Sequence, residues 1–175
     1  MKRRAGCPSG QPALFIFLLF TLILIIISGI DYFTCEIPNV LNYSLLIIGL
    51  ATCLINPILG AEWKARAISS VLGAGLGALL IFIVMIIGKK IFKKEAMGAG
   101  DLMLLAAIGA FEGPQKTLGT LVIGSVLGAI VGSALIFNKK LGLKDQIQFG
   151  PFLAIAAYMN LVLTLSWLNS IFMPF

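Results

Sequence analysis

The sequence predicts an all-α protein that crosses a membrane several times, as a bundle of about six transmembrane helices. Hydrophobic residues make up 59% of the 175 residues and charged residues only 11%, far below the roughly 25% of a typical soluble domain. The charges fall between long apolar stretches, and within some of these stretches glycine recurs every four residues. We expect residues 1–175 to form a single integral-membrane domain within the lipid bilayer.

Six apolar stretches define the expected helices. Four or five of them are long enough to cross a hydrocarbon layer of about 30 Å, which needs about 20 residues. The fourth is too short to span alone, and it fits only if its first turn lies in a polar cavity made by its neighbours. The stretches cover residues 13–30, 37–61, 67–88, 102–111, 117–137 and 149–175.

The first two stretches have distinct starting signals. Basic residues precede residues 13–30, as in a secretory signal, but this run of 18 residues exceeds the roughly 7–15 of such a signal, which favours a retained helix. The second helix should begin near Pro38, because proline lacks a backbone N–H and biases Ile37 towards an extended conformation.

Glycine spacing in the third and fifth stretches predicts close helix packing. Gly73 and Gly77 share one helix face, as do Gly124, Gly128 and Gly132. This small-xxx-small pattern lets helix backbones approach each other in lipid. A nucleotide-binding interpretation of "GAGLGA" fails, because no strand precedes it.

The residue types exclude several kinds of chemistry. Histidine is absent, so Ser-His and Cys-His catalytic pairs and HExxH zinc sites cannot form. The three cysteines are Cys7, Cys35 and Cys53, and their spacing forms no Cys-x-x-Cys pair. We therefore expect ordinary thiols rather than a zinc module or a disulfide framework. We expect no metal, no cofactor and no nucleic-acid partner.

Charged loops barely distinguish the two membrane faces. With six helices, the face carrying loops 31–36, 89–101 and 138–148 has seven basic residues and the other has six. We place the first face in the cytoplasm because "GKKIFKKE" is a compact basic cluster suited to an anionic leaflet. Five of the seven acidic residues share this face; they are either an accident of small numbers or an acidic cavity for a basic partner.

Two aspartates stand where apolar helices meet this face. Asp31 ends the first helix and Asp101 opens the fourth, so the alternation of helices places both on one side. If they share a cavity, they should hold one proton between them. One carboxylate then activates water while the other polarises a peptide carbonyl, as in aspartyl proteases. The alternative is that each aspartate only caps a helix.

Glycines beside the second aspartate favour the catalytic interpretation. Gly98 and Gly100 in "GAGD" remove side chains next to Asp101. They allow either a positive φ angle or the close approach of a substrate strand.

Three motifs occur along the chain in the order "DYFTCEIPN", "MGAGD" and "FGPFLA". They resemble the motifs of the type IV prepilin peptidase family, whose members are membrane aspartyl proteases of the GxGD type. The resemblance implies Asp31 and Asp101 as the catalytic pair. It also implies cleavage of the basic leader of prepilins or pseudopilins at the cytoplasmic face, after glycine and before a hydrophobic residue. Substrate-binding roles are expected for Gly98, Gly100, Glu36, Glu95, Gly150 and Pro151, with the two glutamates attracting the positive leader.

The chain also departs from this family. Longer members carry two Cys-x-x-Cys pairs and methylate the new pilin N-terminus, so we expect peptidase activity without methyl transfer. Met103 stands where many members have lysine, which keeps a non-catalytic assembly factor open. A further alternative is a small transporter or proton- or cation-conducting protein that uses the same aspartates. The particular prepilin and the oligomeric state are not determined by the sequence.

Overall fold

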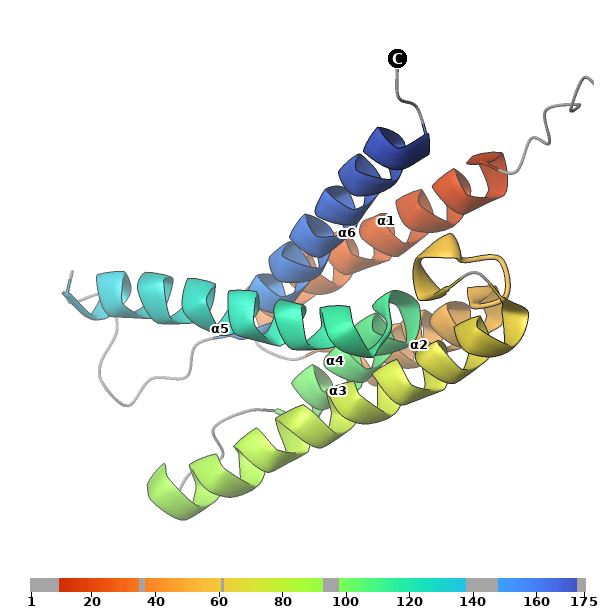
Figure 1. The fold of residues 1–175 in the computed structure, drawn as a ribbon. Coiled ribbons are helices and arrows are strands. Elements are labelled where there is room, and N and C mark those ends of the chain that lie inside the picture. The colour runs from red at the N-terminus through yellow and green to blue at the C-terminus, as the bar shows by residue number, and fades with distance from the viewer. Residues whose placement is uncertain (1–9, 35–36, 61, 93–97, 138–147, 173–175) are drawn as a thin grey trace, which may run out of the picture.

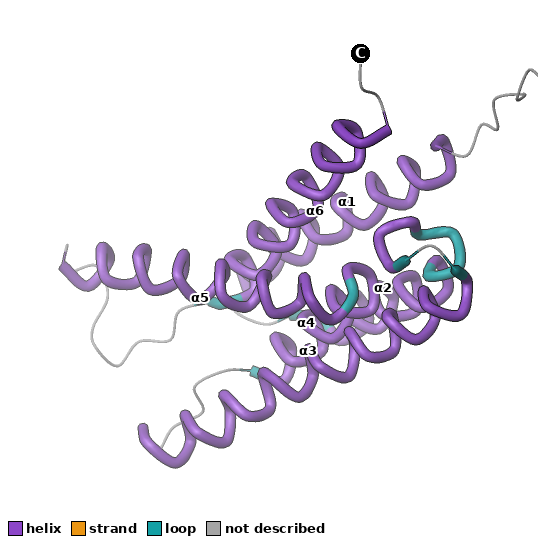
Figure 2. Tube along the Cα trace, in the orientation of Figure 1, coloured by secondary structure: helices purple, strands orange, loops and turns teal. Residues whose placement is uncertain are grey.

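Helices make up nearly all of the chain that the computed structural model describes, residues 10–34, 37–60, 62–92, 98–137 and 148–172. Figure 2 shows the described residues as helices with a few short loops, and these residues contain no strand. The predicted all-α fold and the number of α-helices are confirmed. The elements are α1 (Gly10–Thr34), α2 (Asn39–Thr52), the 3-10 helix η1 (Pro57–Leu59), α3 (Trp63–Phe92), α4 (Ala99–Glu112), α5 (Pro114–Phe137) and α6 (Gly150–Phe172).

Three of these helices, α1, α3 and α5, are long and apolar enough to cross a membrane. The stretch 37–61 differs from a single long helix, because α2 ends at Thr52 and η1 follows. Asn56 causes part of this break: its side chain accepts a hydrogen bond from the Ile58 N–H at 3.1 Å, and Pro57 follows it. Asparagine and proline favour such turns over a continued helix.

The helices surround α4. In Figure 1, α1 and α6 lie side by side and run in opposite directions, with the start of α1 and the end of α6 at the same end of the molecule. The short α4 lies in the middle, where it contacts α2, α3, α5 and α6. This arrangement places the helix that carries Asp101 inside the bundle.

Burial explains how a helix of only 14 residues can belong to a membrane bundle. Every residue from Leu104 to Glu112 is buried, so α4 meets its neighbours rather than lipid. Phe111 stacks on Phe20 of α1 with ring centroids 3.9 Å apart, which joins the first and fourth helices through aromatic packing. The expectation of a short fourth helix is therefore confirmed, but its first turn is sheltered only in part: Asp101 is buried, whereas Gly98 and Ala99 are exposed.

Glycines bring α3 and α4 into backbone contact, as the small-xxx-small spacing predicts for α3. A Cβ atom added at Gly73 would overlap the carbonyl oxygen of Gly109, and one added at Gly77 would overlap that of Leu105. Gly109 therefore takes part in the same close crossing. On α5, Gly124 lies against α6, where an added Cβ would stand 3.4 Å from the carbonyl oxygen of Phe152.

We expect Gly73→Ala to lower the free energy of unfolding by about 1–3 kcal/mol, the usual range for overpacking a tight core. The new methyl group meets backbone atoms, which cannot rotate away. Thermal melting in detergent measures the effect. Gly75→Ala is the matched control, since no atom lies within 4 Å of a Cβ at that position; equal melting of the two variants would contradict the prediction.

Candidate active site

Three helix ends that are distant in sequence meet at one end of the bundle. Asp31 lies in the last turn of α1, Asp101 in the first turn of α4, and Gly150 is the first residue of α6. Both carboxyl groups are buried, with Asp31 4% exposed and Asp101 9% exposed. The alternation of helices along the chain predicts that the two aspartates lie on the same side, and the structure places them close enough for the charge of Asp31 to act on Asp101.

Asp101 makes a local contact with the start of its own helix. Its Oδ2 accepts a hydrogen bond from the Gly98 N–H at 3.3 Å, so the helix-capping role is present. Asp101 lies outside the three long apolar helices. Burial raises the pKa of its carboxyl from the usual 3.8 to about 6; the Gly98 N–H opposes this increase and the charge of Asp31 adds to it. A group with this pKa exchanges its proton near neutral pH.

Asp31 contacts the first residue of α6. A Cβ atom added at Gly150 would overlap Oδ2 of Asp31 and stand 3.1 Å from its Cγ. Glycine is therefore the residue that leaves room for this carboxyl group. The same Oδ2 atom is buried and has no hydrogen-bond partner among the described residues, so it can accept a hydrogen bond from an incoming molecule.

Ile37, which the sequence analysis did not select, fills the space between the two glycine motifs. A Cβ atom added at Gly100 would stand 3.0 Å from the Ile37 Cβ, and one added at Gly150 would stand 3.2 Å from its Cδ1. Gly100 thus permits the close approach of the protein's own chain. The expectation of a positive φ angle is wrong for Gly98, which has a φ of −81° because it caps α4 in an extended conformation.

Asn42 is a second residue that the sequence analysis missed. It lies one turn into α2, is 1% exposed, and its Nδ2 donates a hydrogen bond to the Gly100 carbonyl oxygen at 3.0 Å. The sequence feature that could have identified Asn42 is a polar amide within an apolar helix. Burying such an amide costs free energy unless the amide has hydrogen-bond partners.

The other expected site residues are less informative. Glu36 and Glu95 lie outside the described residues. Pro151 occupies the first turn of α6, where its missing N–H costs little, and it is half-buried. Among the described residues, no three His, Cys, Asp or Glu side chains gather as a metal site would require.

Comparison with known proteins identifies the family. The family model "Type IV leader peptidase family" matches residues 18–133, a range that includes Asp31, Asn42 and Asp101. The chain belongs to the type IV leader peptidase family. No solved structure matches it.

Curated relatives within this family carry the name prepilin leader peptidase/N-methyltransferase. The protein from Xanthomonas campestris pv. campestris is 35% identical over 136 residues, which cover 78% of this chain and 45% of the relative. The Aeromonas salmonicida protein is 37% identical over 145 residues, or 83% of this chain and 48% of the relative. This chain thus spans about half the length of the curated relatives it matches.

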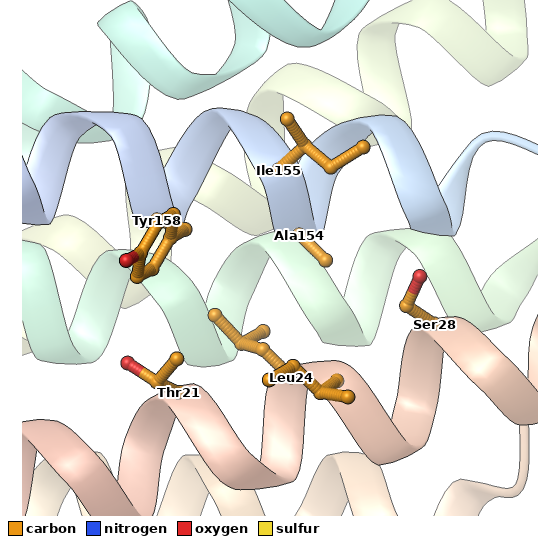
Figure 3. Close-up of a pocket in the computed structure, with 7 residues that line it drawn as sticks. Thr21, Leu24, Ser28, Ala154, Ile155 and Tyr158 are labelled. Atoms are coloured by element: carbon orange, nitrogen blue, oxygen red, sulfur yellow. The ribbon is translucent and has the colours of Figure 1, made fainter.

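A groove beside the aspartates runs along the outside of this leader peptidase fold. It has a volume of about 300 Å³ and lies between α1 and α6 (Figure 3), with Ser28 one turn from Asp31 and Ala154 one turn from Gly150. Its lining is mostly apolar and contains no carboxyl group. Ile155 and Tyr158 on its rim are exposed, which is typical of a lipid-facing surface rather than a catalytic cavity.

A separate polar cluster lies at the opposite end of α4. Oε2 of the buried Glu112 accepts a hydrogen bond from the Thr120 hydroxyl at 2.9 Å. The Thr120 oxygen in turn accepts one from the Asn160 Nδ2 at 2.8 Å. These contacts join α4, α5 and α6 away from the aspartate pair, so Glu112 offers an internal comparison for experiments on Asp101.

Proposed function

We propose that this protein is an aspartyl endopeptidase that removes the basic leader from type IV prepilins or related pseudopilins. Cleavage takes place after glycine and before the hydrophobic residue that begins the pilin's apolar segment. The observation that carries the proposal is that Asp31 and Asp101, 70 residues apart in the chain, are two buried carboxyl groups at one end of the bundle, close enough for the charge of one to act on the other. Membership in a family of leader peptidases supports the same reaction.

The two carboxyl groups have different roles in the proposed mechanism. Asp101, whose pKa is raised to about 6, carries the shared proton and donates a hydrogen bond to the scissile carbonyl oxygen. Asp31 takes a proton from water as the water oxygen bonds to the carbonyl carbon. The C–N bond of the tetrahedral intermediate then breaks as Asp31 gives the proton that it took from water to the leaving nitrogen. The carbonyl group forms again, and its oxygen leaves the shared proton on Asp101.

We place the protein in the cytoplasmic membrane with its aspartate end facing the cytoplasm. The acidic residues of that face, including Glu36 and Glu95, would attract a positive leader. We propose only the peptidase step for these 175 residues and no methyl transfer, because they contain no Cys-x-x-Cys pair.

The proposal is tested with purified protein in liposomes and a candidate prepilin that has a basic leader, glycine and a hydrophobic segment. We expect a single cut after the glycine, identified by mass spectrometry of both products. Proton or cation flux without any cut would instead favour the transporter hypothesis. A cut at another position would contradict the proposed specificity while leaving the peptidase activity in place.

The proton on Asp101 predicts how the rate depends on pH. Above about pH 6, the shared proton is lost, and we expect kcat/KM to fall by about tenfold per pH unit. The measurement is the initial cleavage rate from about pH 5 to about pH 9, with the same buffer on both sides of the membrane. A rate that rises through this range would show that Asp101 is not the proton donor.

A further inference from the structure

Two buried asparagines attach to the backbone of α4, one at each end. Nδ2 of Asn42 donates to the Gly100 carbonyl at 3.0 Å, and Nδ2 of Asn56 donates to the Phe111 carbonyl at 2.8 Å. They are 1% and 0% exposed. The two side chains thus occupy equivalent positions, and their amide donors act in the same way.

The acceptor atoms of the two asparagines differ. Oδ1 of Asn56 accepts the Ile58 N–H at 3.1 Å, so both of its polar atoms are used within the protein. Oδ1 of Asn42 is buried and has no hydrogen-bond partner among the described residues. Buried polar atoms are rarely left unpaired, so the free oxygen of Asn42 needs an explanation that Asn56 does not.

The free oxygen belongs to the same site as the aspartates. Asn42 holds Gly100, Gly100 precedes Asp101, and both Gly100 and Gly150 lie against Ile37. Among the described residues, three buried side-chain oxygens lack a partner, and two of them are Asn42 Oδ1 and Asp31 Oδ2. This end of the bundle therefore contains two acceptors for donors that a bound molecule supplies.

A bound peptide and the water that attacks it together supply the two donors. The activated water donates to the Asp31 carboxylate, whereas the oxygen of a neutral amide matches a backbone N–H, which is the group that it pairs with throughout proteins. A neutral amide can also be buried beside two carboxyl groups without adding a third charge. We propose that Asn42 is a substrate-positioning residue, whose Nδ2 holds the Gly100 backbone beside Asp101 and whose Oδ1 accepts a backbone N–H of the bound peptide next to the scissile bond. This inference rests on the proposed peptidase function.

The test combines Asn42→Leu with substrates in which one backbone amide near the scissile bond is replaced by an ester, which has no N–H. The ester is moved across the neighbouring positions, leaving the scissile amide intact. At one position we expect wild-type kcat/KM to fall by about tenfold, the scale of one lost hydrogen bond in a buried site. Asn42→Leu should cleave the all-amide substrate more slowly and show no further loss with that ester.

Asn56→Leu is the matched control. It removes the equivalent amide at the other end of α4, so it should lower the melting temperature but keep the wild-type response to every ester. If Asn42→Leu does not fold, Asn42→Asp replaces it: this variant keeps an acceptor oxygen and loses the donor to Gly100, so it should retain the ester response while its kcat falls.

The outcomes separate this inference from the proposed function. Cleavage by the wild type, with the same ester response in wild type and Asn42→Leu, would overturn the role of Asn42 and leave the peptidase intact. An ester response in Asn42→Leu, with none in Asn42→Asp, would also overturn it. Absence of any cleavage by the wild type would overturn the proposed function and this inference with it.

Discussion

Asp31→Asn and Asp101→Asn should each lower prepilin cleavage by about a thousandfold or more while the protein stays folded. Asparagine has nearly the same shape as aspartate but can neither take a proton from water nor give one to the leaving nitrogen. Groups that transfer protons in the transition state contribute about 10²–10⁴-fold to the rate, and both carboxyl groups are required in the same reaction. The measurement is initial-rate cleavage in liposomes, with thermal melting of each variant.

Glu112→Gln is the control for this pair of substitutions. Glu112 is buried on the same helix as Asp101, but its hydrogen bond goes to Thr120 at the other end of that helix. Glutamine can still accept that bond, so cleavage by this variant should stay close to the wild-type rate. If a folded Asp31→Asn or Asp101→Asn variant cuts as fast as the wild type, the aspartyl mechanism is wrong.

Gly150→Ala should lower kcat/KM by about a hundredfold without unfolding the protein. The added Cβ would overlap Oδ2 of Asp31, so the carboxyl group must turn away from its present position. A displacement of about 1 Å at a reacting group can cost about two orders of magnitude in rate. Alanine also favours the helix over glycine, so the melting temperature should change little while the activity falls.

Gly29→Ala provides the comparison for Gly150→Ala. Gly29 lies two residues before Asp31 on α1, and a Cβ added there would meet no neighbouring atom within 4 Å. This variant should therefore cleave the prepilin at nearly the wild-type rate. A Gly150→Ala variant as active as the wild type would contradict the prediction. It would show that the Asp31 carboxyl group can move aside without loss of activity.

Much of the fold follows from local properties of the sequence. Hydropathy locates the six helices, Pro38 marks the start of α2, and the glycine spacing of α3 predicts its close packing. The break after Thr52 was missed, because an apolar stretch interrupted by Asn56 and Pro57 still looks continuous when only hydropathy is considered. Turn-forming residues overrode the apolar pattern at that point.

The candidate site was predictable only in part. Asp31 and Asp101 stand out because carboxyl groups are costly in apolar helices, and the alternation of helices places them at one end. Gly100 was selected for a substrate strand, but the residue that it accommodates is Ile37. Asn42 was not selected at all, since an amide in the sequence does not reveal whether its oxygen has a partner.

The order of residues along the chain is enough to predict a helical membrane protein with Asp31 and Asp101 on the same side, because helix length, hydropathy and alternation all depend on that order. The packing of the helices was needed to show that α4 lies enclosed by the other helices, that Gly150 leaves room for Asp31, and that Asn42 holds the Gly100 carbonyl. These contacts join residues tens of positions apart. They arise from how whole helices pack, which no local pattern records.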